Sequence, residues 1–143
     1  LESLSPQGKS DAAPCFRRAA ETVRRRSLVL VFSDFFDPHE AFLSSLRLFR
    51  HKGCEVVLFQ LLDPLETDFP FRGLTEFRDL ETGETLELES EDGRAAYLAD
   101  LAAYTRRMRQ FCGSLDISFE TLSTATPFDR ALLAYFHKRE RLF

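Results

Sequence analysis

The chain has 143 residues, of which 44% are hydrophobic and 29% are charged, a composition typical of one soluble globular domain. Its formal net charge is −4 and its arginine clusters alternate with acidic segments, so we expect no nucleic-acid partner. No apolar run approaches the ~20 residues of a membrane-spanning helix, and we expect a cytoplasmic protein without a membrane segment. Because the chain begins at Leu1 rather than at methionine, we expect it to start inside a longer gene product.

The first strand is the clearest signal in the sequence. Apolar residues recur at helical spacing over 15–23. Within a strand expected over 27–33, residues 28–32 then form a short apolar run that stops at Ser33-Asp34. Such a run, apolar at odd and even positions alike, is typical of a strand buried on both faces of a parallel sheet. The sequence therefore predicts a helix followed by a buried parallel strand.

A second helix and strand follow with short connections. Asp37 and Pro38 have the types of residue that begin a helix, which we expect to end at Gly53. Residues 55–62 predict a second buried strand, and residues 64–73 an irregular loop. This order predicts parallel strands joined by right-handed crossovers.

The second half of the chain adds a hairpin, two helices and a third strand. Residues 75–80 and 85–89 alternate apolar and polar positions around a Gly-containing turn, which predicts a β-hairpin at the edge of the sheet. A long helix is expected over 90–112, a third strand over 117–122, and a last helix from 127 to about 141.

Motifs of common enzyme chemistry are absent from the sequence. It contains neither GxGxxG nor GxxxxGK[ST], and no Ser/His/Asp or Cys/His arrangement is visible. The three cysteines, Cys15, Cys54 and Cys112, each lie in an apolar segment, which predicts buried, reduced thiols. We therefore expect a protein that is not an enzyme.

The candidate site lies where the first two strands end. Ligands of open α/β sheets bind beyond the carboxyl ends of the strands, where Asp34 and Asp63 follow neighbouring strands. We take Asp34, Ser33 and Asp63 as candidate binding residues. A carboxylate with a neighbouring hydroxyl suits Mg²⁺, which keeps several waters. An alternative function is a metal-dependent hydrolase that uses Asp34 and Asp63.

Two strings carry a resemblance to a known fold. Gly8-Lys9-Ser10-Asp11 and, after a helix, RRRSLVLVFSDFFD resemble the second and third metal-site loops of a von Willebrand factor A-like domain. The resemblance implies a metal-ion-dependent adhesion site in which Ser10 and Asp34 are ligands. The first loop of that site, Asp-x-Ser-x-Ser, is not found. Its nearest match, Asp116-x-Ser118-x-Glu120, enters a strand at the amino end.

The later segments resemble one family that carries this A-like domain. The strings LLDPLETDFPF, FRDLETGE, RAAYLADLAAY and TPFDRALLAYF, in that order, are similar to the family catalogued as domain of unknown function fifty-eight, often encoded beside MoxR-type AAA+ ATPases. The resemblance implies an α/β fold: a three-layer, Rossmann-like half-domain with three parallel strands, flanking helices and a hairpin insertion at 71–89. Residues 1–143 would form a single partial A-like domain that lacks the first metal loop.

The resemblance also implies a function. It predicts a non-enzymatic protein-interaction module that works with a MoxR-type AAA+ ATPase in protein maturation or assembly. Mg²⁺ binding should be weak, because Ser10 and Asp34 alone remain of the site. A half-sheet would leave residues 27–33 as an exposed apolar edge, so self-association is expected as well.

Overall fold

The computed structural model describes residues 12–35, 40–78 and 83–140. In chain order its elements are α1 (Ala12–Thr22), β1 (Leu28–Ser33), α2 (Glu40–His51), β2 (Glu55–Leu62), α3 (Pro64–Asp68), β3 (Leu74–Arg78), β4 (Thr85–Glu89), α4 (Ser90–Ser114), β5 (Ser118–Ser123) and α5 (Phe128–Glu140). Asp37, the expected cap of the second helix, lies outside the described residues. None of the helices described is long and apolar enough to cross a membrane.

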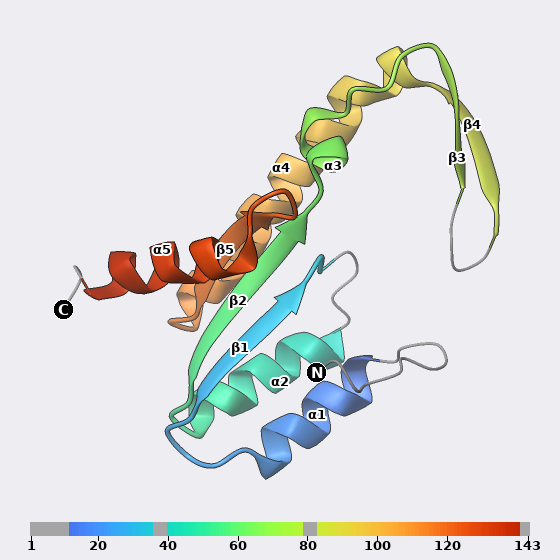
Figure 1. Cartoon of the computed structure of the whole chain (residues 1–143). Coiled ribbons are helices and arrows are strands. Elements are labelled where there is room, and N and C mark those ends of the chain that lie inside the picture. The colour runs from blue at the N-terminus through green and yellow to red at the C-terminus, as the bar shows by residue number, and fades with distance from the viewer. Residues whose placement is uncertain (1–11, 36–39, 79–82, 141–143) are drawn as a thin grey trace.

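β1, β2 and β5 form a parallel sheet with β2 in the centre (Figure 1). The register pairs Leu28 of β1 with Glu55, and Leu62 at the end of β2 with Ser123 of β5. The order in space follows the order in the chain. This arrangement confirms the three predicted parallel strands and brings their carboxyl ends to one edge.

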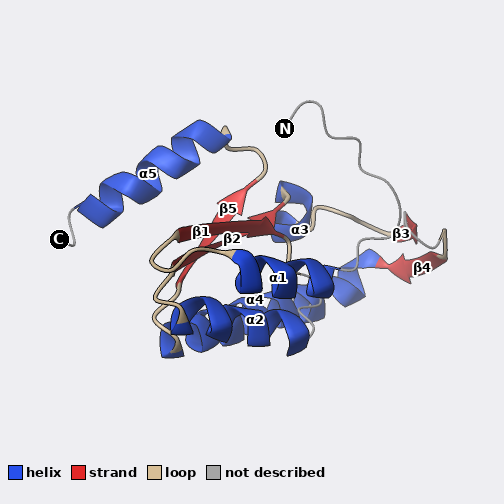
Figure 2. Cartoon of the chain, turned by 90° about the horizontal axis from the view of Figure 1, so that it is seen from below, coloured by secondary structure: helices blue, strands red, loops and turns tan. Residues whose placement is uncertain are grey.

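Helices cover both faces of this sheet, with α1, α2 and α4 on one face and α5 on the other (Figure 2). Successive side chains of β2 point to opposite faces. Val56 and Leu58 lie in the larger core with α2 and α4, whereas Val57 and Phe59 face α5. The ring of Phe59 meets that of Tyr135 edge-on at 5.3 Å. The result is the predicted mixed α/β arrangement, consistent with a Rossmann-like half-domain.

β1 is less buried than its sequence predicts. Leu28 and Phe32 are 46% and 45% exposed, although the ring of Phe32 stacks on Phe59 at 4.8 Å. In the described part of the chain, β1 pairs on one side with β2 and has no strand on its other side. The helix on that face, α5, packs over Phe59 of the central strand. The expectation of burial on both faces is therefore wrong for this edge strand.

A short helix stands where an irregular loop was expected over 64–73. Asp63 caps α3: its Oδ1 accepts a hydrogen bond from the Leu65 N–H at 2.8 Å. In return, the Asp63 N–H donates to Oε2 of Glu66 at 2.7 Å. Pro64 occupies the first turn, where a missing N–H costs nothing. This reciprocal capping box explains why five residues suffice for a helix.

The hairpin forms as predicted but does not extend the main sheet. β3 and β4 pair antiparallel, from Leu74 with Glu89 to Arg78 with Thr85, as a separate two-stranded sheet. Figure 1 shows it at the start of α4, beyond the carboxyl ends of the strands. The expected place at the sheet edge is therefore wrong. α4 connects the hairpin to the sheet, because Met108 and Cys112 in its second half lie in the larger core.

The three cysteines differ in exposure. Cys54 and Cys112 are buried as predicted, and burial raises the pKa of the Cys112 thiol to about 11. Cys15 is exposed, which corrects the expectation of three buried thiols. The apolar pattern around Cys15 instead places Phe16 against the Phe42 ring, at 4.7 Å.

Candidate functional site

Asp34 follows β1 at the carboxyl edge, and the residues around it fix the end of the strand. The Ser33 hydroxyl donates to Asp34 Oδ1 at 3.3 Å and accepts from the Phe35 N–H at 3.0 Å. Phe35 has a positive φ of 54° and is buried against Phe42 and other rings. The Tyr104 hydroxyl donates to the Phe35 carbonyl. Phe35 is thus held inward, and Asp34 is left exposed at the surface.

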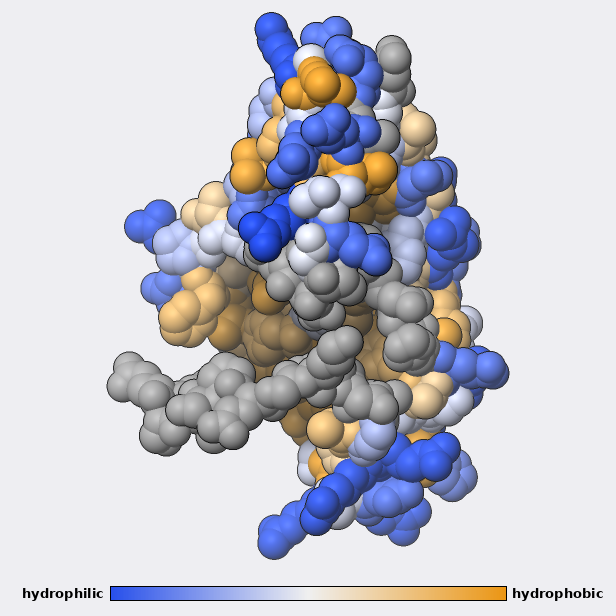
Figure 3. Space-filling view, turned by 90° about the vertical axis from the view of Figure 1, so that its right-hand side faces the viewer, coloured by the Kyte–Doolittle hydropathy of each residue, from blue (hydrophilic) through white to orange (hydrophobic). Residues whose placement is uncertain are grey.

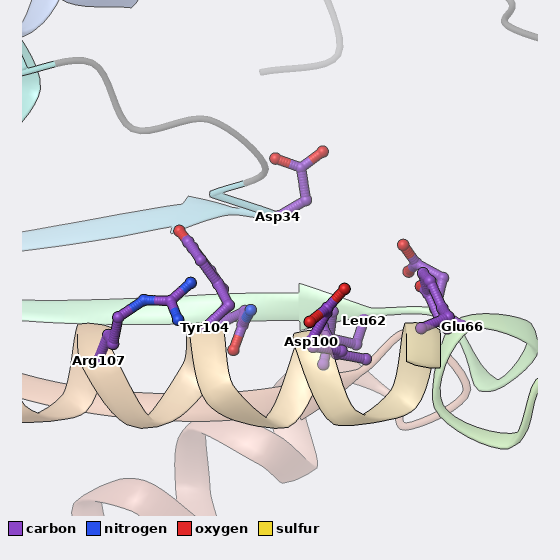
Figure 4. Close-up of a pocket in the computed structure, with 9 residues that line it drawn as sticks. Asp34, Leu62, Glu66, Asp100, Tyr104 and Arg107 are labelled. Atoms are coloured by element: carbon purple, nitrogen blue, oxygen red, sulfur yellow. The ribbon is translucent and has the colours of Figure 1, made fainter. Parts of the chain in front are cut away.

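Asp34 lines a pocket of about 280 Å³ between the end of the sheet, α3 and α4. Figure 4 shows Asp34 on the β1 side, Asp100, Tyr104 and Arg107 on α4, and Glu66 on α3. The other residues of the wall are Gln60, Leu62, Tyr97 and Leu101. The wall therefore carries three carboxylates, a guanidinium, two phenols and an amide, set among a mostly apolar lining.

Gln60 is the buried polar residue of this pocket. It lies on β2, is 1% exposed, and its Oε1 accepts hydrogen bonds from Thr105 Oγ1 at 3.3 Å and Thr121 Oγ1 at 3.5 Å. These bonds tie α4 and β5 to the central strand directly under the pocket. Tyr97 forms another part of the wall, where burial and the neighbouring charge of Glu66 raise the pKa of its phenol.

The predicted site residues do not all reach this pocket. Asp63 does not line it, because Asp63 Oδ1 caps α3 and its Oδ2 accepts from Thr124 Oγ1 at 2.8 Å. The Leu65 N–H and then the Thr124 hydroxyl lower the pKa of Asp63. Ser33 contacts Asp34 but is not part of the wall. Ser10 lies outside the described residues.

The string Asp116-x-Ser118-x-Glu120 lies at the opposite, amino end of the sheet, as predicted. Asp116 is exposed and accepts a hydrogen bond from Nη2 of Arg50 at 2.5 Å. The same guanidinium donates to the carbonyls of Leu115 and Cys54, each at 2.8 Å. Arg50 thereby connects the end of α2 to the starts of β2 and β5. This end of the molecule is joined by structural contacts and is remote from Asp34.

The described residues do not by themselves make a divalent-cation site. Within 12–35, 40–78 and 83–140, no three His, Cys, Asp or Glu side chains converge closely enough to hold a metal ion. Asp34 and the Ser33 hydroxyl supply two neighbouring oxygens, whereas both oxygens of Asp63 already accept hydrogen bonds. This donor set falls short of the six oxygens that Mg²⁺ takes unless waters supply the remainder.

Sequence reasoning missed the contribution of α4 to the pocket. Tyr97, Asp100, Tyr104 and Arg107 lie three, four and three residues apart, the spacing that places side chains on one helix face. Polar residues at this spacing, beside the apolar positions that enter the core, were a signal available in the sequence. The face of α4 that lies against the strand ends is determined by the packing of Met108 and Cys112 in the core, which fixes the rotation of the helix.

The fold and this edge define an α/β protein with a parallel half-sheet, an open pocket beyond its strand ends and an appended hairpin. The chain belongs to the DUF58 family: the family model described as "Protein of unknown function DUF58" matches residues 1–108. The match ends within α4, so β5 and α5 lie beyond it. No curated protein and no solved structure shows significant similarity to the chain.

Proposed function

We propose that this chain is a non-enzymatic protein-interaction module, related to A-like domains, that works with a MoxR-type AAA+ ATPase in protein maturation or assembly. The observation that carries the proposal is the open pocket at the strand ends, in which Asp34 and Asp100 are exposed to solvent. Acid–base catalysis is favoured by a site that excludes water. Docking of a protein partner instead needs side chains that are exposed to solvent in the free protein. The kind of partner is taken from the sequence resemblance alone, because the matched family is described as one of unknown function.

The alternative of a metal-dependent hydrolase has less support. It needs Asp63 as a second reactive group beside Asp34, but Asp63 caps α3 and binds Thr124. Removing it from those bonds would cost stability before any chemistry began. Turnover of a generic phosphoester that is lost in Asp34→Asn would favour the hydrolase over the interaction module.

A binding assay with a purified MoxR-type ATPase from the same genome tests the proposal. We expect nucleotide-dependent binding that Asp34→Asn weakens, because the pocket loses a charge that faces the partner. Asp129→Asn, an equally conservative change at an exposed position on α5, is the matched control. Equal binding by wild type and Asp34→Asn, or an equal loss in Asp129→Asn, would contradict the role given to the pocket.

We also propose that β1 supports self-association of this chain. Its Leu28 and Phe32 are nearly half exposed on a strand that has one paired side within the described residues. Unpaired strand edges of this kind favour pairing with another chain. Sedimentation velocity over a range of concentrations tests this proposal. We expect a dimer that Phe32→Lys dissociates, and a monomer at all concentrations would refute it.

A further inference from the structure

A second hollow lies between α3, the hairpin and the start of α4, and it adjoins the Asp34 pocket, with which it shares Glu66 and Tyr97. It is a groove of about 540 Å³, here called the aromatic groove, and its apolar wall is formed by Leu65, Phe69, Phe71, Phe77, Leu86 and Tyr97. Figure 3 views the molecule from the side of the hairpin and shows hydrophobic residues among charged ones on this face. The volume falls within the range of sites that hold ligands or side-chain anchors of a partner.

The aromatic groove is preformed by contacts among its own rings. Phe69 lies 4.9 Å from Tyr97 and 5.9 Å from Phe77, and Phe71 lies 5.3 Å from Phe77, measured between ring centroids. These rings belong to neither of the two hydrophobic cores that flank the main sheet. Leu65 and Leu86 remain 53% and 57% exposed. A preformed apolar site of this kind binds without first ordering its side chains, which favours affinity.

The chain segment that forms the aromatic groove is strongly acidic. Residues 63–100 contain twelve acidic and three basic residues, a formal charge of −9, whereas the whole chain has −4. Glu66 and Glu89 belong to the wall itself. Of the three arginines, Arg94 is engaged with α3, because it donates to the carbonyls of Phe69 at 3.2 Å and Asp68 at 2.9 Å. An apolar groove with an acidic rim is complementary to an apolar segment with basic flanks.

One polar atom in the wall lacks a partner. The hydroxyl of Ser90, a wall residue, is buried. Of the buried side-chain nitrogen and oxygen atoms in the described residues, it is the one without a hydrogen-bond partner. A buried hydroxyl without a partner is unfavourable. A carbonyl oxygen of a docked polypeptide would supply the acceptor once the serine side chain turns toward the groove. This observation favours a polypeptide over a purely apolar ligand.

From these features we infer that the aromatic groove binds a partner-protein segment in which aliphatic or aromatic anchor residues are flanked by lysine or arginine. The inference rests on the proposed function and adds a second contact surface for its partner, beside the Asp34 pocket. A second copy of the chain fits less well, because two copies of this acidic segment would lie close together and repel each other. An anionic membrane surface is disfavoured by the same repulsion.

A peptide-binding assay with matched variants tests the inference. The probe is a fluorescently labelled 16-residue amphipathic peptide of leucine, phenylalanine and lysine, and its counterpart carries glutamate in place of lysine. We expect Leu86→Ser to weaken binding of the basic peptide about tenfold, the loss typical of one buried anchor contact. Leu133→Ser on α5 is the control, because Leu133 is also 57% exposed but lies outside the groove. It should change binding less than about twofold.

A second pair of variants tests the charge. Glu89→Gln should weaken the basic peptide and reduce its dependence on salt, whereas Glu21→Gln, an exposed position on α1, should not. Equal binding of the acidic peptide, or equal losses in Leu86→Ser and Leu133→Ser, would overturn the inference. A dimer that Leu86→Ser dissociates would also overturn it, because the occupant would then be a second copy.

The ATPase assay separates this inference from the proposed function. If Leu86→Ser binds the ATPase as well as wild type does, the aromatic groove does not contact the ATPase, although the proposed function, which rests on the Asp34 pocket, stands. If no variant binds the ATPase while the basic peptide still distinguishes Leu86→Ser from Leu133→Ser, the groove stands and the choice of ATPase partner fails.

Discussion

Arg50 offers the sharpest test of how the amino end of the sheet is held together. Its guanidinium donates to the carbonyls of Leu115 and Cys54 and to the carboxylate of Asp116. A hydrogen bond that involves a charged group contributes about 1.5–3 kcal/mol, and an exposed ion pair about 0–1 kcal/mol. The side chain of Arg50 is 27% exposed and that of Asp116 is 93% exposed. The two carbonyl contacts should therefore outweigh the ion pair.

We expect Arg50→Met to lower the free energy of unfolding by about 3 kcal/mol, since methionine keeps the apolar stem and loses every donor. Asp116→Asn should lower it by less than about 1 kcal/mol. Urea unfolding followed by circular dichroism at 222 nm measures both, and the chain has no tryptophan to follow instead. Equal effects of the two variants, or a loss below about 1 kcal/mol in Arg50→Met, would refute the reasoning.

Three further predictions follow from other parts of the molecule. In the native protein a thiol reagent should label Cys15 quickly and Cys112 slowly, because burial raises the pKa of Cys112 to about 11; equal rates would contradict this. The pKa of Asp63 is lowered by folding, so its stabilising contribution is present above its ordinary value of 3.8 and lost as the pH falls below it. Asp63→Asn should therefore reduce the drop in urea midpoint between pH 5 and pH 2.5. Calorimetry with Mg²⁺ should show weak binding, and micromolar affinity abolished by Asp34→Ala would contradict it.

The sheet was predictable because each of its strands has a recognisable apolar pattern in its own short stretch of sequence. Residues 55–62 are apolar at nearly every position, which identified the central strand with its correct ends. The edge position of β1 was not predictable from the run 27–33 alone, since exposure depends on which neighbours flank it. α3 could have been found: Asp63-Pro64-Leu65-Glu66 repeats the pattern of Asp37-Pro38-His39-Glu40, which was read as a helix start.

The candidate site was predictable in part for the same reason. Asp34 could be placed at the carboxyl edge because it follows a recognisable strand. Asp100 and Arg107 could not be placed beside it, because they come from a helix whose rotation is set by distant packing. The aromatic groove depends on contacts between Phe69, Phe77 and Tyr97, which lie on three separate elements. Contacts between side chains of separate elements form when the chain folds, so the sequence pattern of each element does not reveal them.

The detour of the chain between β2 and β5 has a consequence for folding. Leu28 pairs with Glu55, 27 residues later, whereas Val57 pairs with Ser118, 61 residues later. Loop-closure entropy grows slowly with length, and this difference costs only about 0.7 kcal/mol. The hairpin and the first half of α4 are thus inserted at small thermodynamic cost. The order in which the strands fold should nevertheless be affected. β1 should pair with β2 first, because this closes the shorter loop, and β5 should then pair with β2.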